Sequence, residues 1–312
     1  MDNLTHSLVG AVMGRMGLKR LTPRAMPALI LSANLPDIDS FVAPLFGAVP
    51  IAEHRGFTHG VGGLVTMPFL AAAIILLWER FRPGKEGPIK LGALLLVCFL
   101  GTLSHPLLDF MNTYGTRLLD PISHRWFYGD TLFILDPWIW ITLILGLEMS
   151  WRAERLGKNW TRPAMWAFGA MLGYIGLNAA ISLRAEALAR PLVARVAKPD
   201  MIVAGEVPLE FWKRKMIWRG GGIGGFGTYN LLDGLNHLWL DPKIVPLHLD
   251  DPRLAEAAKR DKHVRAFLFW SRMPMVQLEG GHAYLTDQRF FESGRSSSSA
   301  FLIRLDNSSP NP

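Results

Sequence analysis

The sequence predicts a mainly α-helical membrane bundle of about six helices, four of them clearly spanning the bilayer, followed by a small β-rich soluble domain. Three observations support this division. Apolar runs of bilayer length fill the first 185 residues, and short clusters of Lys and Arg flank these runs. After about residue 190 the pattern changes to short β-branched and aromatic runs bounded by glycine, proline and aspartate. The expected domains are therefore residues 1–185 and 190–305, with a flexible tail at 306–312.

The composition fits a chain that is part membrane and part soluble. Half of the 312 residues are hydrophobic, 11 are Trp, and the mean hydropathy is +0.20. A net charge of +7 would suit a nucleic-acid partner, but Lys and Arg cluster beside apolar segments, so we expect none. The single cysteine, Cys98, excludes a disulfide framework and a cysteine-based metal site, and we interpret it as a small core residue.

Six apolar runs predict the membrane helices in chain order. Segments 4–17 and 24–35 are too short to span comfortably, so we expect them to pack within the bundle or reach partway across the bilayer. The four others each approach the roughly 20 residues that a bilayer requires. They are 61–78, 91–108, 134–149 and 163–183. No cleavable signal peptide is expected, because the N-terminus lacks a basic leading region.

The distribution of positive charge predicts the orientation. Lys and Arg concentrate in segments 18–24, 79–90 and 150–162, which the positive-inside rule places in the cytoplasm. The alternate connections, and the chain after about residue 184, then face outward. We therefore expect a multi-pass protein of the inner (plasma) membrane whose C-terminal domain is periplasmic.

Polar residues that can ligate a metal gather on this outer side although the orientation was derived without them. They are His6, Asp37, Asp39, His54, His59, His105, Asp109 and His124. His105 and Asp109 are four positions apart, which places both side chains on one face of a helix. Each residue alone has an ordinary interpretation, such as a core histidine or a turn cap. Together, unpaired, they would cost several kcal/mol, and a metal is the simplest common partner.

The donor types predict the metal and the reaction chemistry. Nitrogen and carboxylate oxygen without sulfur favour zinc, with manganese as the alternative, and we expect one or two ions. A bound metal would activate water for hydrolysis, and whichever of Asp37 and Asp39 is not a tight ligand could act as general base, with Asp39 our candidate. Arg55 could clamp an anionic phosphate, or it could pair with a lipid headgroup or an aspartate.

Four sequence motifs resemble a known family. MDNLTHSLVGAVMG, NLPDIDS, HRGFTHG and SHPLLDFMNTYG, in that order, are similar to the membrane-bound metal-dependent hydrolases also described as YdjM-like or LexA-regulated inner-membrane proteins. The later DPISHRWFYGDTLFILDPWIW resembles the branch of that family with a C-terminal extension. The resemblance implies distant similarity to the zinc-dependent phospholipase C and single-strand nuclease superfamily, whose members are helical enzymes that cleave phosphate esters.

The resemblance also implies roles for single residues. His6 matches an N-terminal ligand, Asp37 or Asp39 the early carboxylate, His59 the histidine that opens the next helix, and His105 with Asp109 the HxxxD pair. The second such pair of the soluble enzymes is missing after Asp109, and His124 is the candidate replacement. The resemblance therefore implies one or two metals rather than three.

The function expected from these observations is a metal-dependent hydrolase that acts on a phosphate ester or lipid-related substrate at the outer face of the membrane. Membrane lipid and a small-molecule or lipid substrate are the expected partners. A non-catalytic membrane protein with a structural metal remains an alternative, because the sequence does not show an open coordination position. A transporter is a weaker alternative, because its polar residues would line a path across the bilayer rather than gather at one end.

The C-terminal region reads as a sheet domain. Runs 200–207, 213–220, 264–280 and 282–291 predict strands, and one helix is expected near 251–262. GGGIGGFG contains a formal GxGxxG from Gly222 to Gly227, but no helix follows it, so we interpret its glycines as a hairpin turn. SGRSSSSA at 293–300 predicts a flexible loop. The histidines of this region show no ligand spacing and are expected to be ordinary surface or domain-interface residues: His237, His248, His263 and His282.

Overall fold

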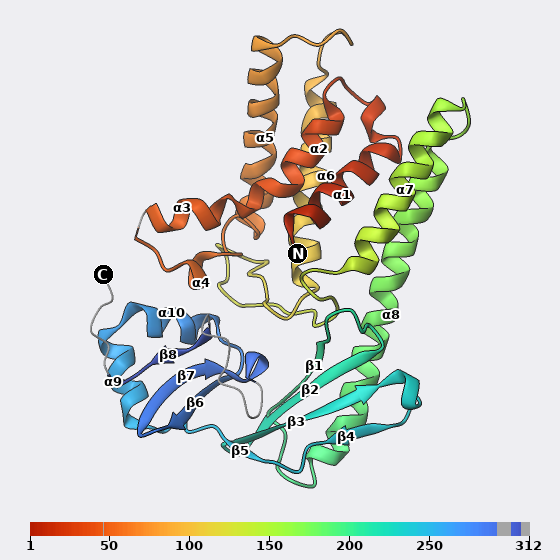
Figure 1. Cartoon of the computed structure of the whole chain (residues 1–312). Coiled ribbons are helices and arrows are strands. Elements are labelled where there is room, and N and C mark those ends of the chain that lie inside the picture. The colour runs from red at the N-terminus through yellow and green to blue at the C-terminus, as the bar shows by residue number, and fades with distance from the viewer. Residues whose placement is uncertain (46, 292–300, 307–312) are drawn as a thin grey trace. The chain divides into compact units, whose positions relative to one another are not determined.

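A computed structural model of the chain describes all residues except 46, 292–300 and 307–312 (Figure 1). The predicted loop at 293–300 and nearly all of the predicted tail lie outside the described residues. The chain divides into two compact units. The first contains residues 1–42, 53–180 and 208–211, and the second contains 43–52, 181–207 and 212–312.

The first unit is built from helices, and the last of them, α8, continues into the second unit. Its elements are α1 (Asn3–Arg15), η1 (Leu18–Arg20), α2 (Ala25–Asn34), η2 (Leu35–Ile38), α5 (Val61–Phe81), α6 (Leu91–Phe110), α7 (Pro137–Arg155) and α8 (Thr161–Val193). α3 (Asp39–Leu45) begins in the first unit and ends in the second, and α4 (Pro50–Glu53) lies almost entirely in the second. The short segments predicted at 4–17 and 24–35 are confirmed as α1 and α2. Asp2 caps α1 by accepting hydrogen bonds from the main-chain N–H groups of Leu4 and Thr5.

Among the described residues, three helices are long and apolar enough to cross a membrane: α5, α6 and α8. α5 contains 21 residues, and a helix of that length extends about 31 Å, close to the thickness of the hydrocarbon core. The count of four spans was therefore too high. Segment 134–149 does lie largely in a helix, α7, but the second half of that helix carries Glu148, Arg152, Glu154 and Arg155.

Small residues bring α1, α2 and α6 close together. A Cβ atom added at Gly10 of α1 would lie 2.9 Å from the carbonyl oxygen of Leu29 in α2. One added at Gly101 of α6 would lie 2.1 Å from Oγ of Ser32. Membrane helices without bulky side chains at their crossings can approach backbone to backbone in this way. The close approach fixes the relative positions of three helices that carry, or directly precede, the predicted ligands.

The helix directions put the predicted ligands and the basic clusters at opposite ends of the spans. His59 lies just before α5, which runs toward Arg80, and α6 runs back from Lys90 to Asp109 (Figure 1). Both ligand-bearing ends therefore lie at the same end of the helix pair, as the sequence predicted.

The second unit contains two antiparallel sheets. Its strands are β1 (Met201–Glu206), β2 (Lys213–Gly220), β3 (Ile223–Asn230), β4 (Leu238–Leu240), β5 (Val245–Pro246), β6 (Pro274–Glu279), β7 (His282–Asp287) and β8 (Ile303–Arg304). The first sheet has the order β1-β2-β3-β4 with β5 also paired to β3, and the second has the order β6-β7-β8. The unit also holds η3 (Leu231–Asp233), α9 (Pro252–Arg260), α10 (Lys262–Trp270) and η4 (Gln288–Phe290).

The sequence interpretation of this unit is confirmed in part. The runs at 200–207, 213–220 and 282–291 contain strands, and the helix expected near 251–262 is α9. The hairpin is confirmed, because Gly221 and Gly222 adopt positive φ angles of 59° and 79° between β2 and β3. The strand predicted at 264–280 was wrong in its first half, which forms α10. Asp261 caps this helix through the N–H group of His263, and its buried face is apolar.

Candidate metal centre

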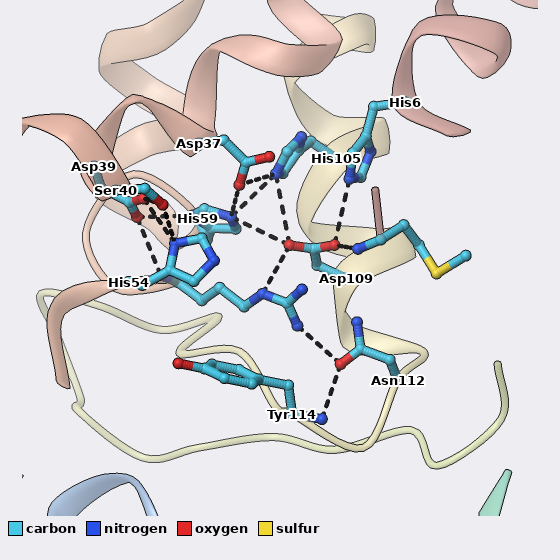
Figure 2. Close-up of polar contacts among 12 residues, drawn as sticks. His6, Asp37, Asp39, Ser40, His54, His59, His105, Asp109, Asn112 and Tyr114 are labelled. Carbon is cyan, nitrogen blue, oxygen red and sulfur yellow. Dashed lines mark hydrogen bonds and ion pairs between the residues drawn. The ribbon is translucent and has the colours of Figure 1, made fainter. Parts of the chain in front are cut away.

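Five of the predicted ligands converge at one end of the helical unit (Figure 2). His6 comes from α1, Asp37 from η2, His59 from the turn before α5, and His105 and Asp109 from α6. All except Asp37 are fully buried, and the Asp37 side chain is 17% exposed. The sequence therefore brings together residues that are up to about a hundred positions apart in the chain.

Glycines shape the HRGFTHG loop that carries His54 and His59. A Cβ atom at Gly56 would lie 2.0 Å from Nη2 of Arg117, and one at Gly60 would lie 2.5 Å from the carbonyl oxygen of Asp120. The main chain of Arg117 also donates to the carbonyl oxygen of Arg55 over 2.9 Å. The loop is therefore held tightly against segment 117–120, and larger residues at these two positions would displace it.

A main-chain oxygen fixes the protonation of His105. Nδ1 of His105 lies 2.6 Å from the carbonyl oxygen of Ala33 near the end of α2. A carbonyl oxygen only accepts, so Nδ1 must carry the hydrogen. In the neutral ring, Nε2 then presents a lone pair to the centre, the form in which imidazole ligates a metal.

Thr58 fixes the protonation of His59 in the same sense. The Thr58 hydroxyl donates to Oδ2 of Asp39 over 2.7 Å and lies 2.9 Å from Nδ1 of His59. Because its single hydrogen is used on Asp39, the hydroxyl oxygen can only accept from Nδ1–H of His59. Nε2 of His59 is then also a lone pair.

The two lone pairs face each other and two carboxylates. Nε2 of His59 and Nε2 of His105 are 3.0 Å apart. Oδ1 of Asp37 lies 3.5 Å and 3.3 Å from these nitrogens, and Oδ2 of Asp109 lies 3.3 Å and 3.6 Å from them. Four acceptors this close repel one another unless a proton or a cation lies among them.

The separations fit a tetrahedral divalent ion. Ligand atoms at about 2.0–2.2 Å from zinc in tetrahedral geometry are roughly 3.3–3.6 Å from each other. The five separations just given run from 3.0 to 3.6 Å. Asp37, His59, His105 and Asp109 thus form a cluster that can hold a metal ion.

His6 and the α-amino group of Met1 approach the other oxygen of Asp109. Nε2 of His6 lies 3.3 Å from Oδ1 of Asp109, and the Met1 nitrogen forms an ion pair with the same atom. The His6 ring stacks on His105 with centroids 3.8 Å apart. Burial lowers the pKa of His6 well below its ordinary value. His6 is therefore neutral and can serve as a further nitrogen donor.

A second group of donors lies beside the first and shares Asp37 with it. Asp37, Asp39 and His54 offer ligand atoms within 4.8 Å of one another. Nδ1 of His54 lies 2.8 Å from Oδ1 of Asp39 and 3.0 Å from Oγ of Ser40. The His54 side chain is partly exposed, so this group lies closer to the surface than the buried cluster.

Both aspartates of NLPDID stay ionised. Burial raises the pKa of Asp37, but positive charge among the imidazoles of His105 and His59, whether a proton or a bound cation, outweighs this effect and holds it well below its ordinary range. Asp39 behaves alike, because contacts with His54 and His59 outweigh its burial. Ionised carboxylates are the form that a metal requires.

Comparison with known proteins assigns the chain to a family. Residues 1–185, more than half of the chain, match the family of the YdjM inner membrane protein. The chain belongs to the YdjM family. The protein YfhP of Bacillus subtilis (strain 168), described as uncharacterized, is 24% identical over 284 residues, covering 87% of this chain and 80% of YfhP. No solved structure matches, and similarity to the phospholipase C superfamily stays a prediction.

The match covers all of the converging residues of this YdjM family member. Family membership and three apolar helices place the protein in a membrane. The resemblance inferred from the four motifs is thereby confirmed for the family itself.

In this YdjM family member, Arg55 contacts a predicted ligand. Its Nε lies 3.1 Å from Oδ2 of Asp109, and its Nη1 donates to Oδ1 of Asn112 over 2.8 Å. The residue is only 2% exposed, and its guanidinium lies 4.8 Å from the Tyr114 ring. Burial lowers the pKa of Arg55 to about 10, so it remains charged at neutral pH. This geometry matches the aspartate-partner alternative, and a phosphate-clamp role stays a prediction.

The structure does not bring His124 to the other predicted ligands. Its Nδ1 lies 2.9 Å from Oδ2 of Asp120, which also pairs with Nη1 of Arg117 over 3.1 Å, and the His124 side chain is 64% exposed. Neither group of possible metal ligands in the described part of the chain includes it.

The sequence interpretation missed three contributors to the centre: Ala33, Thr58 and Asn112. Thr58 lies inside HRGFTHG, and Asn112 follows Asp109 by three positions, so proximity in the sequence could have suggested both. The carbonyl oxygen of Ala33 has no sequence signal, because every residue carries one.

Proposed function

We propose that this protein is a membrane-bound metal-dependent hydrolase that acts on a phosphate ester or lipid-related substrate at the periplasmic face of the membrane. Zinc is the metal that the donor set suits best, with manganese as the alternative. The observation that carries the proposal is the pair of lone-pair Nε2 atoms of His59 and His105, 3.0 Å apart and flanked by two carboxylates. A divalent cation satisfies all four acceptors at once.

A bound ion of this kind supplies Lewis acidity and lowers the pKa of water toward neutrality. The chain's own residues then have separable roles. Asp37, His59, His105 and Asp109 would hold the ion. His6 contacts Asp109 and stands as a reserve nitrogen donor.

In this proposal, Asp39 and His54 move a proton. Burial raises the pKa of Asp39, but its contacts with His54 and His59 outweigh this effect, so its own affinity for a proton is low. Its contact with Nδ1 of His54 orients that ring and leaves Nε2 of His54 able to accept a proton from an attacking water. Asp39 thus supports general-base catalysis through His54.

A structural metal is the second candidate function, and one observation favours it. Four protein donors at tetrahedral separations are enough to close a coordination shell, whereas catalysis requires an open position. The adjoining group of Asp37, Asp39 and His54 favours the hydrolase instead, because a purely structural ion has no use for a second, more exposed set of donors.

Metal content and hydrolysis separate these candidates. Protein purified in detergent without chelator should carry about one or two zinc or manganese ions per chain. It should release product slowly from chromogenic phosphodiesters or phospholipid, and chelation should abolish the rate. His105→Ala should remove metal and activity together, because it deletes a donor without a substitute.

His282→Ala is the matched control, since that histidine pairs with Asp306 in the second unit and should affect neither measurement. Metal without hydrolysis of any phosphodiester, phosphomonoester or carboxylic ester would transfer the assignment to the structural metal. Folded protein without metal would overturn both candidates.

A further inference from the structure

An uncharged stretch of the chain connects two segments that contribute residues to the candidate centre. Residues 40–52, SFVAPLFGAVPIA, contain no Asp, Glu, Lys, Arg or His, and they connect Asp39 to the loop with His54. Thirteen uncharged and mostly apolar residues are too few to span a bilayer but suit a segment that enters one leaflet or lies in its interface. In a water-exposed loop this composition would be unusual.

The last residue of η2 and the α3 helix that follows it present one apolar face. Ile38, Phe41, Val42 and Leu45 follow the spacing of three, four and seven positions that places side chains on one side of a helix. All four are exposed, with Phe41 at 77% and Leu45 at 80%. Asp39 points the other way and is buried at the centre.

The level of this face relative to the membrane follows from its neighbours. η2, which α3 continues without a break, packs against α5 and α6, both of which are long and apolar enough to span. Asp37 of η2 lies near His59, just before α5 begins, and near His105 in the last turns of α6. α3 therefore begins beside the ends of α5 and α6 that carry the candidate centre.

We propose that residues 38–45 insert into the leaflet on the metal side and that lipid acyl chains cover the face of Ile38, Phe41, Val42 and Leu45. A lipid bound there has its phosphate ester at the depth of the candidate centre. If the proposed hydrolase activity holds, on which this consequence rests, the substrate is an amphiphile with acyl chains rather than a freely soluble ester.

One contact indicates that protein, instead of lipid, could cover the apolar face. Residues 43–52 group with the second unit, and Nζ of Lys262 in α10 donates to the carbonyl oxygen of Gly47 over 3.1 Å. That bond engages the main chain and leaves Phe41 and Leu45 exposed. Burial of this apolar face against the protein itself, rather than in lipid, is therefore the alternative that an experiment must distinguish.

Site-directed spin labelling tests the proposal. Because Cys98 is the single cysteine, Cys98→Ala gives a background for Phe41→Cys and Leu45→Cys, with Glu53→Cys as an exposed, charged control from the end of α4. In nanodiscs of phosphatidylethanolamine and phosphatidylglycerol, nitroxides at 41 and 45 should collide with oxygen and avoid a water-soluble nickel chelate. The oxygen-to-nickel collision ratio should be several-fold higher there than at 53.

Labels at 41 and 45 that collide freely with the nickel chelate would overturn the proposal, as would labels shielded from both reagents, which would indicate cover by protein. The readout does not depend on catalysis. Lipid-exposed labels in a protein that cleaves no substrate would contradict the proposed hydrolase activity and support the insertion. Water-exposed labels in an active enzyme would contradict the insertion and support the hydrolase activity.

Discussion

At His105, one hydrogen bond decides what the ring can bind. Nδ1–H is committed to the carbonyl oxygen of Ala33, so only Nε2 is left for the centre. His59 is set by a side-chain hydroxyl and a carboxylate instead. Both rings therefore carry the hydrogen on Nδ1, although different partners hold it there. The acceptor atoms that then face one another favour a cation between them.

Arg55 is expected to act through Asp109. Its guanidinium holds Oδ2 of Asp109 at 3.1 Å, so Arg55→Ala removes the cation beside a buried ligand. Losing the residue that orients a ligand typically costs about 10–100-fold in metal affinity. We therefore predict that zinc affinity, measured by competition with a chelating dye, falls by that order and that hydrolysis falls in parallel.

Asn112→Ala is the graded control, because it breaks the contact with Nη1 of Arg55 and keeps the contact with Asp109. It should weaken zinc binding less than Arg55→Ala. A variant Arg55→Ala with full metal content and a raised KM would instead support the phosphate clamp.

At the scale of elements, a buried ion pair connects strand β7 to the residues around it. Asp287 lies at the end of β7 and accepts from Nε and Nη2 of Arg289, from the Ser271 hydroxyl and from the Met273 main chain. Burial raises the pKa of Asp287, but Arg289 and the hydrogen bonds outweigh it and depress the pKa below its ordinary value of 3.8. The carboxylate thus joins β7 to the start of β6 and to η4.

The depressed pKa predicts acid sensitivity of this sheet. A carboxyl group with a lower pKa in the folded state contributes stability that is present above the unfolded pKa and is lost as pH falls through the folded pKa. The loss should therefore appear below about pH 4. Hydrogen exchange of peptides covering 271–291, corrected for intrinsic rates, should show it.

Asp287→Asn should lower the opening free energy of the same peptides at pH 7 by roughly 3–5 kcal/mol, because Arg289 stays buried without its counter-charge. It should also flatten the dependence between pH 5 and pH 3. Equal pH profiles for the two proteins would mean that another group causes the acid loss.

An element could be predicted when its own stretch of sequence carried a clear pattern. α5, α6 and α8 are evident from uninterrupted apolar runs, and the β2–β3 turn from consecutive glycines. α10 was mistaken for a strand because VRAFLFW is rich in β-branched and aromatic residues, and the tertiary environment overrides that preference. α7 looked like a span because the window at 134–149 stops before most of its charges.

At the scale of the whole molecule, the orientation depends on whether α7 crosses the membrane. α5 and α6 together return the chain to the side on which α5 began. If α8 alone follows, the C-terminal unit ends in the cytoplasm, and if α7 crosses as well, it ends outside. α7 packs closely on α8, since a Cβ atom at Gly146 would lie 2.2 Å from that of Ala167, and α7 carries its charges at one end.

Reporter fusions decide the matter. The Lys and Arg cluster at 150–162 predicts that a reporter after residue 85 or 157 reads cytoplasmic and that one after residue 120 or at the C-terminus reads periplasmic. This arrangement requires α7, with its charged second half, to cross in addition to the three long apolar helices. The fusion after 85 is the internal control, because both arrangements agree there. A periplasmic reading at 157 with a cytoplasmic C-terminus would overturn the proposed location of the second unit.

The sequence predicted most of the residues of the candidate site, but not the hydrogen bonds that set their protonation. The spacing of His105 and Asp109 and the topology together indicated which side chains meet, and His6, Asp37 and His59 do join them. His124 could not be placed, because a long loop offers no periodicity from which to infer direction. The proton positions depend on Ala33 and Thr58, and such contacts are visible only once the backbone path is known.

The two hydrogen bonds that set the imidazoles differ in how easily mutation can remove them. Thr58 can be lost by a single codon change, and the setting of His59 would be lost with it. No side-chain replacement at position 33 deletes the oxygen that His105 uses, because all twenty amino acids carry the same carbonyl group. Substitution of Ala33 therefore leaves the hydrogen bond to Nδ1 of His105 intact as long as the α2 backbone does not move. Of the two imidazole settings, that of His105 is the less sensitive to mutation of its partner residue.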